Sequence, residues 1–498
     1  MYNAASGWLM TSLNADPLIV SLVQAANSLP LFLLALPAGA LADMLDKRRF
    51  ILTLEILTSI FTAIFALLVS LGVVTPAVLL LFIVLVGALG ALETPAWQAI
   101  VPQLVPQPAL SSAVAANSLG VNISRAVGPA LAGATILALG MAAPFWLDAV
   151  SNVGVIAVIF WWKPTARAPN ALPAERLASA IRVGVRYARH NRYLRATLAH
   201  AVAFFISASA YWALLPLIAR NQLHGGPSVY GVLLGAIGAS AVAGALLLPR
   251  LKAKAKANKL IAFGELGTAL ALALFGLAKH EWLAVLACLV AGASWIVVLA
   301  TLNVSAQGAL PDWVRGRGLA AYVTVFFGTM TVGSALWGWV AQHLGLAPAQ
   351  YIACAGALLA IPLSRRWRLR SGPAADLTPS MHWPEPVMEH EVTDDAGPVL
   401  VTIEYHVAPE NRTAFLEALA PVARERKRDG AYAWGVFQDT AHRTRYLETF
   451  LLDSWLEHMR QHQRVTNADR TAQERLRALT LSEPLVSHHI ASEVRSGS

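Results

Sequence analysis

Long apolar runs separated by short polar segments fill the first three quarters of the 498-residue chain. Because a helix rises about 1.5 Å per residue, a run of about 20 apolar residues crosses the roughly 30 Å hydrocarbon core of a membrane. The pattern predicts eleven such helices, over residues 17–41, 50–73, 76–98, 111–138, 142–162, 195–219, 228–250, 259–278, 281–303, 317–343 and 347–364.

Residues 1–13 are also apolar, but as a helix they extend only about 20 Å. We expect them to be the end of a truncated first helix in an architecture of twelve helices. The alternative is a short segment at the membrane interface followed by eleven helices. The segment lacks the basic start and long apolar core of a signal peptide.

The composition agrees with a membrane protein of several spans, because 56% of the residues are hydrophobic and only 13% are charged. The formal net charge of +9 does not indicate nucleic-acid binding, since basic residues of membrane proteins gather in cytoplasmic loops. Cys288 and Cys354 both lie in apolar runs, so the sequence predicts neither a disulfide framework nor a metal site. We expect no cofactor.

Basic residues are concentrated in alternate loops, and the loops between them contain only Arg220 and Lys279. Because basic loops face the cytoplasm, this side of the protein is predicted to be cytoplasmic, together with the C-terminal tail. The basic loops are 46–49, 163–195, 250–259, 315–317 and the segment after residue 364.

The apolar spans form two sets that repeat each other on either side of an Arg-rich stretch. Two parallel six-helix halves are typical of transporters that bind substrate between the halves and rock around that site. A channel or a membrane enzyme has no particular need of this symmetry. The repeat pairs Gly128 with Gly333, Gly133 with Gly338, and Glu55 with Glu265.

These motifs resemble those of the major facilitator superfamily. The segment GALADMLDKRR is similar to the family's loop between the second and third helices, with Met44 and Asp46 as departures. SRAVGPALAGA is similar to the Gly-Pro motif of proton-coupled exporters, although the fourth helix lacks the Arg of many such members. ETPAWQAIVPQLVP with AANSLGVNISRAVGPALAG resembles the branch that includes enterobactin-type siderophore exporters. The resemblance covers about residues 1–365 and implies an all-α bundle of 6+6 helices in the bacterial plasma membrane.

The loop GALADMLDKRR contains five candidates for a gating role. Gly39 permits two helices to approach closely, because it has no side chain. Asp43 lies where its helix leaves the membrane, and a carboxylate there suits the positive N-terminus of a neighbouring helix. The resemblance implies that this partner is the helix over 317–343 and that the contact stabilises the outward-facing state. The three bases that follow are expected to bind anionic headgroups. The alternative is that they only determine on which side of the membrane the loop lies. These bases are Lys47, Arg48 and Arg49.

The helix over 111–138 contains Gly128, Pro129 and Gly133. Proline removes a backbone donor and favours a kink, while the two glycines allow tight packing. We expect the partner to be the helix over 317–343, which contains their repeat equivalents. The resemblance implies a bias toward export, and ordinary packing of small residues is the alternative.

Ionisable groups inside a membrane are costly and are therefore candidates for a site. Arg125 falls near mid-membrane and is our candidate for contact with substrate or an anion. Asp148 or Glu93 is expected to be its counter-charge or a proton carrier, and Asn122 to supply uncharged hydrogen bonds. The alternative for Arg125 is a structural pair that holds its helix to the preceding one.

Other side chains of the apolar spans are weaker candidates for a site. Glu55 and Glu265 lie near helix ends, where structural roles are favoured. Trp295 and Phe326, near mid-span, are candidates to line an aromatic cavity.

A polar, Pro-rich linker follows the last apolar run, and the pattern then changes to alternating strands and amphipathic helices in the order βαββαβ. This order is that of a ferredoxin-like α+β unit, and it resembles the dimeric domains of the antibiotic-biosynthesis monooxygenase type. His458 and His462 are four residues apart, but two histidines without a third ligand are weak support for a metal site. We expect a binding or dimerising domain with surface histidines.

The sequence therefore predicts a secondary active transporter, not an enzyme: a proton-coupled exporter of a small amphipathic molecule such as a siderophore, drug or metabolite. The alternative is a membrane-tethered enzyme or sensor whose tail acts on or binds a small molecule. The expected parts are two transmembrane halves (1–162 and 195–364), a cytoplasmic central loop (163–194), a linker (365–397) and a cytoplasmic ferredoxin-like domain (398–498).

Overall fold

The computed structural model describes residues 1–100, 110–162, 177–364, 366–369, 376–380, 382–383, 393 and 396–491. The chain forms two compact units. We call residues 1–177, 196–305 and 320–371 the membrane unit, and residues 178–195, 306–319 and 372–498 the tail unit.

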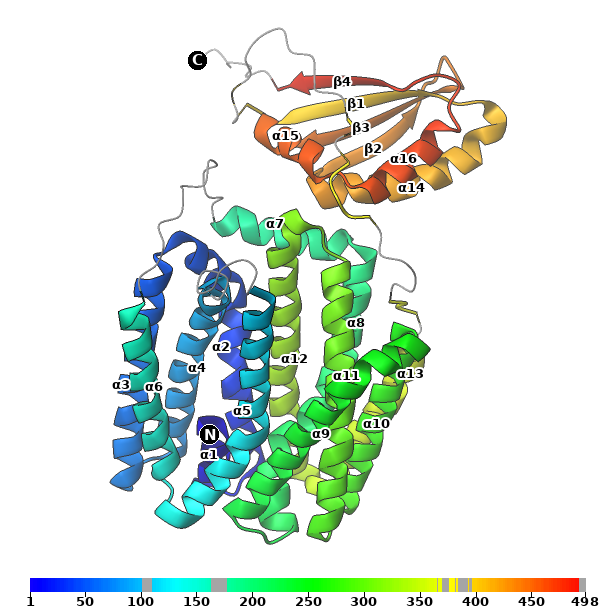
Figure 1. Cartoon of the computed structure of the whole chain (residues 1–498). Coiled ribbons are helices and arrows are strands. Elements are labelled where there is room, and N and C mark those ends of the chain that lie inside the picture. Colours follow the sequence, from blue (N-terminus) through cyan, green and yellow to red (C-terminus); the bar gives the residue numbers. More distant parts are fainter. Residues whose placement is uncertain are drawn as a thin grey trace, which may run out of the picture. The chain divides into compact units, whose positions relative to one another are not determined.

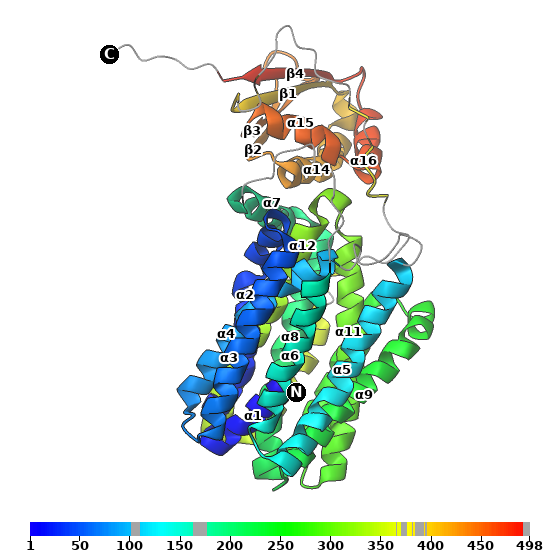
Figure 2. The same ribbon diagram turned by 60° about the vertical axis from the view of Figure 1, so that its left-hand side comes forward.

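The membrane unit is a bundle of helices in two halves (Figure 1, Figure 2). The first half contains α1 (Tyr2–Leu13), α2 (Pro17–Met44), α3 (Lys47–Ser70), α4 (Pro76–Ile100), α5 (Leu110–Leu139) and α6 (Ala143–Trp161). The second contains α8 (Arg192–Leu217), extended by the π-helical turn η3 (Ile218–Gln222), then α9 (Pro227–Lys254), α10 (Ala257–Leu277), α11 (Glu281–Gly308), α12 (Arg315–Leu344) and α13 (Leu346–Ser364). Each of the eleven predicted apolar spans coincides with one of these helices.

Within the described residues, nine helices are long and apolar enough to cross a membrane. The described apolar stretches of α5 and α13, Val127–Leu139 and Leu346–Pro362, are shorter. The chain is therefore a membrane protein that crosses the bilayer several times.

Each half packs its helices in the same way. α3 packs against α6 in the first half, as α10 packs against α13 in the second. α2 and α9 are also equivalent: both have 28 residues and both begin at a proline, Pro17 and Pro227. Proline is well suited to the first turn of a helix, where its missing N–H has no partner to lose.

The contact of α5 with α9 overturns one prediction. A Cβ atom added to Gly133 would lie 2.7 Å from the carbonyl oxygen of Pro227 and 3.4 Å from Cα of Gly231. The expectation that Gly133 packs against the helix over 317–343 is therefore wrong. That helix, α12, uses Gly338 to approach Ser21 of α2.

The two contacts between the halves are copies of each other. In the repeat alignment Ser21 stands at the position of Gly231, as Gly133 stands at that of Gly338. The repeat relates α5 to α12 and α2 to α9. α5 packs on α9, the equivalent of α2, and α12 packs on α2 itself. The sequence identified equivalent glycines, but equivalence alone does not say that they face each other.

Two other glycines of the predicted gating set make no tight contact with the described residues. A Cβ atom at Gly39 would meet no described atom within 4 Å, and the expected close approach there remains a prediction, because the side chains of residues 40 and 42–44 lie outside the described residues. A Cβ atom at Gly128 would lie 3.6 Å from the backbone nitrogen of Met1, an ordinary contact. Pro129 takes part through its carbonyl oxygen, which lies 3.1 Å from a Cβ atom placed on Gly231.

The loop between α2 and α3 is held by its own charged residues. Asp46 caps α3, because its side chain accepts a hydrogen bond of 2.8 Å from the backbone N–H of Arg49. Arg48 donates to the carbonyl oxygens of Ile159, at 3.2 Å, and Phe160, at the C-terminus of α6. Arg48 therefore has a protein partner in addition to any role in topology or headgroup binding. The side chain of Asp43 lies outside the described residues.

The tail unit contains an antiparallel sheet in the order β2-β3-β1-β4, with helices on one face (Figure 2). Side chains of β1 and β3 alternate between buried and half-buried, and the buried ones pack on Phe415, Leu419 and Trp455. The elements are β1 (Val399–His406), α14 (Arg412–Asp429), β2 (Ala433–Gln438), β3 (Arg445–Leu452), α15 (Trp455–Arg464), α16 (Asn467–Arg477) and β4 (Leu485–Ile490). The second helical stretch of the expected order is thus two helices.

The tail unit also includes α7 (Leu177–His190), a helix in the stretch that was expected to be a loop. Arg186 of α7 donates to Glu457 of α15 at 3.1 Å. The Tyr187 hydroxyl donates to the carbonyl oxygen of Ala309 at 3.2 Å, and the guanidinium of Arg428 lies over the Tyr187 ring. α7, the segment 306–319 and the sheet domain therefore form one packed body.

Candidate functional site

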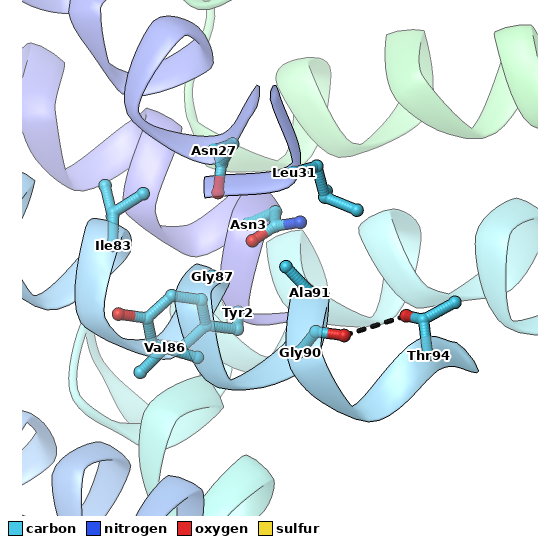
Figure 3. Close-up of a pocket in the computed structure, with 10 residues that line it drawn as sticks. All are labelled: Tyr2, Asn3, Asn27, Leu31, Ile83, Val86, Gly87, Gly90, Ala91 and Thr94. Carbon is cyan, nitrogen blue, oxygen red and sulfur yellow. Dashed lines mark hydrogen bonds between the residues drawn. The ribbon is translucent and has the colours of Figure 1, made fainter. Parts of the chain in front are cut away.

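A cavity of about 300 Å³ lies among α1, α2 and α4 of the membrane unit (Figure 3). This volume is at the lower end of the range for small-molecule sites. The lining residues are Tyr2 and Asn3 from α1, Asn27 and Leu31 from α2, and Ile83, Val86, Gly87, Gly90, Ala91 and Thr94 from α4.

Small residues of α4 shape the cavity. A Cβ atom at Gly87 would lie 3.2 Å from Pro30 Cγ, so α2 and α4 approach closely at this level. At Gly90, almost one turn further, a Cβ atom would meet no described atom within 4 Å. The face of α4 around Gly90 is therefore left open.

Polar groups of the cavity come mainly from α1 and α2. The amide groups of Asn3 and Asn27 lie on the same side of the cavity in Figure 3, opposite the backbone of α4. Each amide offers both donors and an acceptor. Among the described residues the Tyr2 hydroxyl is buried without a hydrogen-bond partner, and its ring meets Phe145 edge-on at 5.4 Å. With its apolar walls, the cavity suits a molecule that has both an apolar body and hydrogen-bonding groups.

A cluster of carboxyl groups lies near this cavity. The side chains of Glu55 in α3 and Glu93 in α4 are close enough to interact with each other. Since a carboxylate has no donor, a hydrogen bond between the two groups would require a proton on one of them. Asp148 of α6 interacts electrostatically with Glu55 and with Tyr2 of the cavity. The cluster is thus able to hold a proton within reach of a cavity residue.

The structure brings together only part of the predicted substrate site. Glu93 and Asp148 belong to one carboxyl cluster, with Glu55, for which a structural role was favoured. The helix positions of Asn122 and Arg125 fall in α5, but their side chains lie outside the described residues. The predicted pairing of Arg125 with these carboxylates remains a prediction.

The polar residues that line the cavity are not among the predicted site residues. Asn3 and Tyr2 lie in the segment expected to be the end of a truncated helix, and Asn27 lies within an apolar run. A signal was present, because an amide inside an apolar span is itself unusual.

The aromatic residues predicted to line a cavity pack against each other in the second half. The Phe326 ring lies 4.3 Å from that of Phe205 and 6.0 Å from that of Trp295, measured between centroids. These distances are those of ordinary aromatic packing. The three rings join α8, α11 and α12.

The tail unit has a buried polar centre of its own. Glu448 is fully buried and accepts hydrogen bonds from the Tyr405 hydroxyl at 2.7 Å and from the Trp434 indole at 2.8 Å. Arg426 faces it at 3.6 Å, and its guanidinium lies 4.6 Å from the centroid of the Trp383 ring. This centre has the partners that a buried charge needs.

Histidines gather next to this centre. The His458 ring lies 4.9 Å from His462 and 4.6 Å from His488. His458 is 2% exposed, so the expectation of surface histidines is wrong for this residue. Burial lowers the pKa of His458 to about 3 and that of His462 to about 4, with the nearby His488 adding to both effects. In the described part of the chain no three His, Cys, Asp or Glu residues are arranged to hold a metal ion.

Comparison with known proteins connects this architecture to a family. Residues 1–496 match the family model described as transmembrane secretion effector, MFS_3. The staphyloferrin A transporter of Staphylococcus aureus is 25% identical over 343 residues, which are 68% of this chain and 85% of that protein. The multidrug efflux pump Tap of Mycolicibacterium fortuitum is 26% identical over 359 residues, 68% of this chain and 84% of that protein.

Among solved structures, a POT family transporter in complex with 5-aminolevulinic acid is similar in fold. The TM-score is 0.59 at 12% sequence identity, over 73% of this chain and 92% of that one. The helical bundle, its internal repeat and these relatives agree. The chain belongs to the transmembrane secretion effector family of major facilitator transporters.

Proposed function

We propose that this transporter is a proton-coupled exporter of a small amphipathic molecule and works by alternating access. The observation that carries the proposal is the approach of two carboxyl groups, Glu55 and Glu93, within the membrane unit, where a shared proton would allow them to lie side by side. The pair lies near the cavity, because Glu93 directly precedes the cavity residue Thr94. Loss or gain of that proton changes the charge buried beside the substrate.

The lining of the cavity supports the choice of substrate class. Apolar walls and two amides suit a molecule with an apolar body and several hydrogen-bonding groups. The names of the relatives agree with this class, since one carries a siderophore and another expels drugs. Export is the direction in which the efflux relative works.

The contacts between the halves support the alternating-access part of the proposal. Gly133 lies at a close contact of backbone with backbone, where a rocking movement of α5 on α9 needs no side chain to move aside. Asp43 at the end of α2 and Arg125 in α5 are proposed as gating and substrate-facing groups. In the proposed orientation the tail unit is cytoplasmic.

The experiment uses inverted membrane vesicles from bacteria that produce the chain, with an imposed acid-inside gradient. We expect accumulation of ethidium or staphyloferrin A inside the vesicles. Glu93→Gln should abolish this accumulation, because an amide cannot exchange the proton, and Arg125→Ala should abolish it by loss of substrate contact. Glu281→Gln, at an exposed carboxyl where α11 begins, is the matched control and should transport normally. Equal accumulation with and without the gradient would contradict proton coupling.

A second candidate is that the tail unit binds a small molecule as a sensor. We propose a ferredoxin-like α+β class for its sheet domain, and the strand order supports this class. The face of the sheet opposite the helices also suits dimerisation. The observation that favours a ligand is that both ring nitrogens of His458 and both amide atoms of Gln461 are buried without partners among the described residues. Deleting residues 371–498 should leave efflux unchanged if the transporter acts alone. A change in efflux would favour the sensor.

A further inference from the structure

A second proton-binding site, in the other half of the membrane unit, follows from the surroundings of Glu265. This residue of α10 is 1% exposed. Within the described residues neither of its carboxyl oxygens has a hydrogen-bond partner. The polar group that faces it is His200 of α8, whose Nδ1 lies 4.0 Å from Glu265 Oε1. That distance is too long for a hydrogen bond and short enough for an ion pair.

The other side of the His200 ring fixes where its proton lies. Nε2 of His200 is 2.8 Å from the carbonyl oxygen of Trp367. A carbonyl oxygen can only accept, so Nε2 carries the hydrogen. In a neutral imidazole Nδ1 then presents a lone pair toward Glu265. Two acceptors therefore face each other in a buried place, unless one more proton is bound between them.

We propose that His200 and Glu265 together form a proton-binding site of the second half. The proton comes from water and binds at Nδ1 of His200 or at Oε1 of Glu265. The net charge of the pair then changes from −1 to 0, and no other bond forms or breaks. An unpaired buried charge is costly, and the bound proton removes the net charge of the pair.

The internal repeat supports this assignment independently of the contact itself. Glu265 is the repeat equivalent of Glu55, which interacts with the carboxyl group of Glu93 in the first half. The two halves use different partners, a histidine in one and a carboxyl group in the other. In both halves, the carboxyl group at this repeat position is buried and lacks a full set of hydrogen-bond donors among the described residues.

Among the described residues, the helices packed around the pair place their other charged groups toward the ends of the bundle, including Arg192 and Arg195 of α8. α13, which packs on α10, contains no Asp, Glu, Lys, Arg or His. α11 packs on Gly264, and its acid Glu281 lies at the opposite end of that helix. Bases at the same end of the bundle are exposed, namely Lys256, Lys259, Arg366 and Arg368.

The site is tied to the segment that leaves the membrane unit. Besides the bond from His200 to Trp367, Leu369 donates its N–H to Asn258 of α10 at 2.9 Å. The Asn258 side chain donates in return to the Leu369 carbonyl oxygen at 3.3 Å. Proton uptake by His200 strengthens its donation to Trp367, because the ring becomes a cation. The segment after α13 is thus held most tightly in the protonated state.

The test is infrared difference spectroscopy of the full chain in lipid bilayers, between about pH 8 and about pH 4, a range that includes the ordinary pKa values of His and Glu. Acidification should produce a band of a buried protonated carboxyl or of imidazolium. The band should be lost in both Glu265→Gln and His200→Gln, and it should remain in the control Glu281→Gln. A band retained in both site variants, or absent from the unaltered chain, would overturn the proposal.

A further variant covers the case in which Glu265→Gln does not fold. Glu265→Asp keeps the carboxyl and shortens its reach, so it should shift the midpoint of the band without removing it. An unchanged midpoint would also contradict the assignment. The role of the His200–Glu265 pair in transport rests on the proposed function, but the infrared band is measured without substrate. Loss of efflux in Glu93→Gln with this band intact separates the first site from the second.

Discussion

Buried carboxyl groups have opposite surroundings in the two units of the molecule. In the tail unit, Glu448 accepts two hydrogen bonds and faces Arg426. In the membrane unit, Glu265 is equally buried, but neither oxygen is hydrogen-bonded to a described residue. The residue type and the burial are the same, and the partners differ.

The difference separates a structural charge from a group that exchanges a proton. A carboxylate with a complete set of donors is held ionised, and its removal leaves those donors unpaired. A carboxyl without donors is most stable when it takes up a proton. The partner set, rather than burial, therefore indicates which acids stabilise the fold and which are available for function.

The largest expected effect tests the structural side of this comparison. Glu448→Ala leaves the Arg426 guanidinium, the Tyr405 hydroxyl and the Trp434 indole without an acceptor. We expect the tail unit to lose about 3–5 kcal/mol of stability. Hydrogen exchange of the sheet amides, measured by mass spectrometry on the full chain, reports the loss. Glu265→Gln is the control and should leave that exchange unchanged; similar effects of both variants would break the comparison.

The second prediction concerns how the membrane unit holds together without such charge networks. Gly133→Ala places a Cβ atom 2.7 Å from a backbone carbonyl oxygen, so α5 and α9 must move apart. Overpacking of this kind costs about 1–3 kcal/mol. The melting temperature of the purified chain should fall. Gly128→Ala, on the same helix but in an ordinary contact, should leave it equal or higher, since alanine favours helix. A fall in both variants would argue against the specific contact.

The third prediction is a pH dependence of the tail unit. The pKa of buried His458 lies at about 3, below the ordinary value near 6.5, so the unfolded chain binds the proton more readily. The stability that His458 contributes is therefore complete above about pH 6.5 and decreases as the pH falls toward the folded value, by up to about 1.4 kcal/mol per pH unit. Denaturation of the full chain, followed by hydrogen exchange of the sheet, should show this slope. His458→Gln should reduce the slope, and the part that remains should come from His462, whose pKa is lowered to about 4. An unchanged slope would show that His458 does not contribute.

The smallest expected effect is at the contact of α7 with the sheet domain. Arg186→Glu and Glu457→Arg should each weaken the tail unit, and the double exchange should restore part of the loss. We expect a coupling free energy of about 1 kcal/mol, as for partly buried neighbours in one network. Melting of the four proteins completes the cycle. Because Arg464 also binds Glu457, at 2.6 Å, an additive result would mean that Arg464 alone neutralises that carboxylate.

Much of the fold could be predicted from the sequence, because apolar periodicity marks helices directly. The eleven spans coincide with helices, and the strand pattern after residue 398 corresponds to the observed sheet. α7 was missed since its many arginines make it polar on average, although one side of it packs on Ala309 and Glu457. Length and mean polarity do not reveal an amphipathic helix.

The candidate site was harder to predict, because it depends on which helices meet. Glu93 and Asp148 are predictable as costly charges inside apolar spans, but their proximity to Glu55 depends on how α3, α4 and α6 pack together. The wrong partner for Gly133 has the same origin. A small residue in a helix indicates that another helix packs closely against it, but it does not say which helix. That neighbour becomes clear only once it is known that α5 packs on α9 and α12 packs on α2.

The bonds of Arg48 have a consequence for the order of events during synthesis. Its partner Ile159 lies 111 residues later in the chain, so the guanidinium is free while the first helices are inserted. During that period it is available, with its neighbours, to retain the loop on one side of the membrane, which is the cytoplasmic side in the proposed orientation. Once α6 has been made, the same guanidinium binds the end of that helix. One side chain thus acts first in orienting the nascent chain and later in fastening the finished bundle.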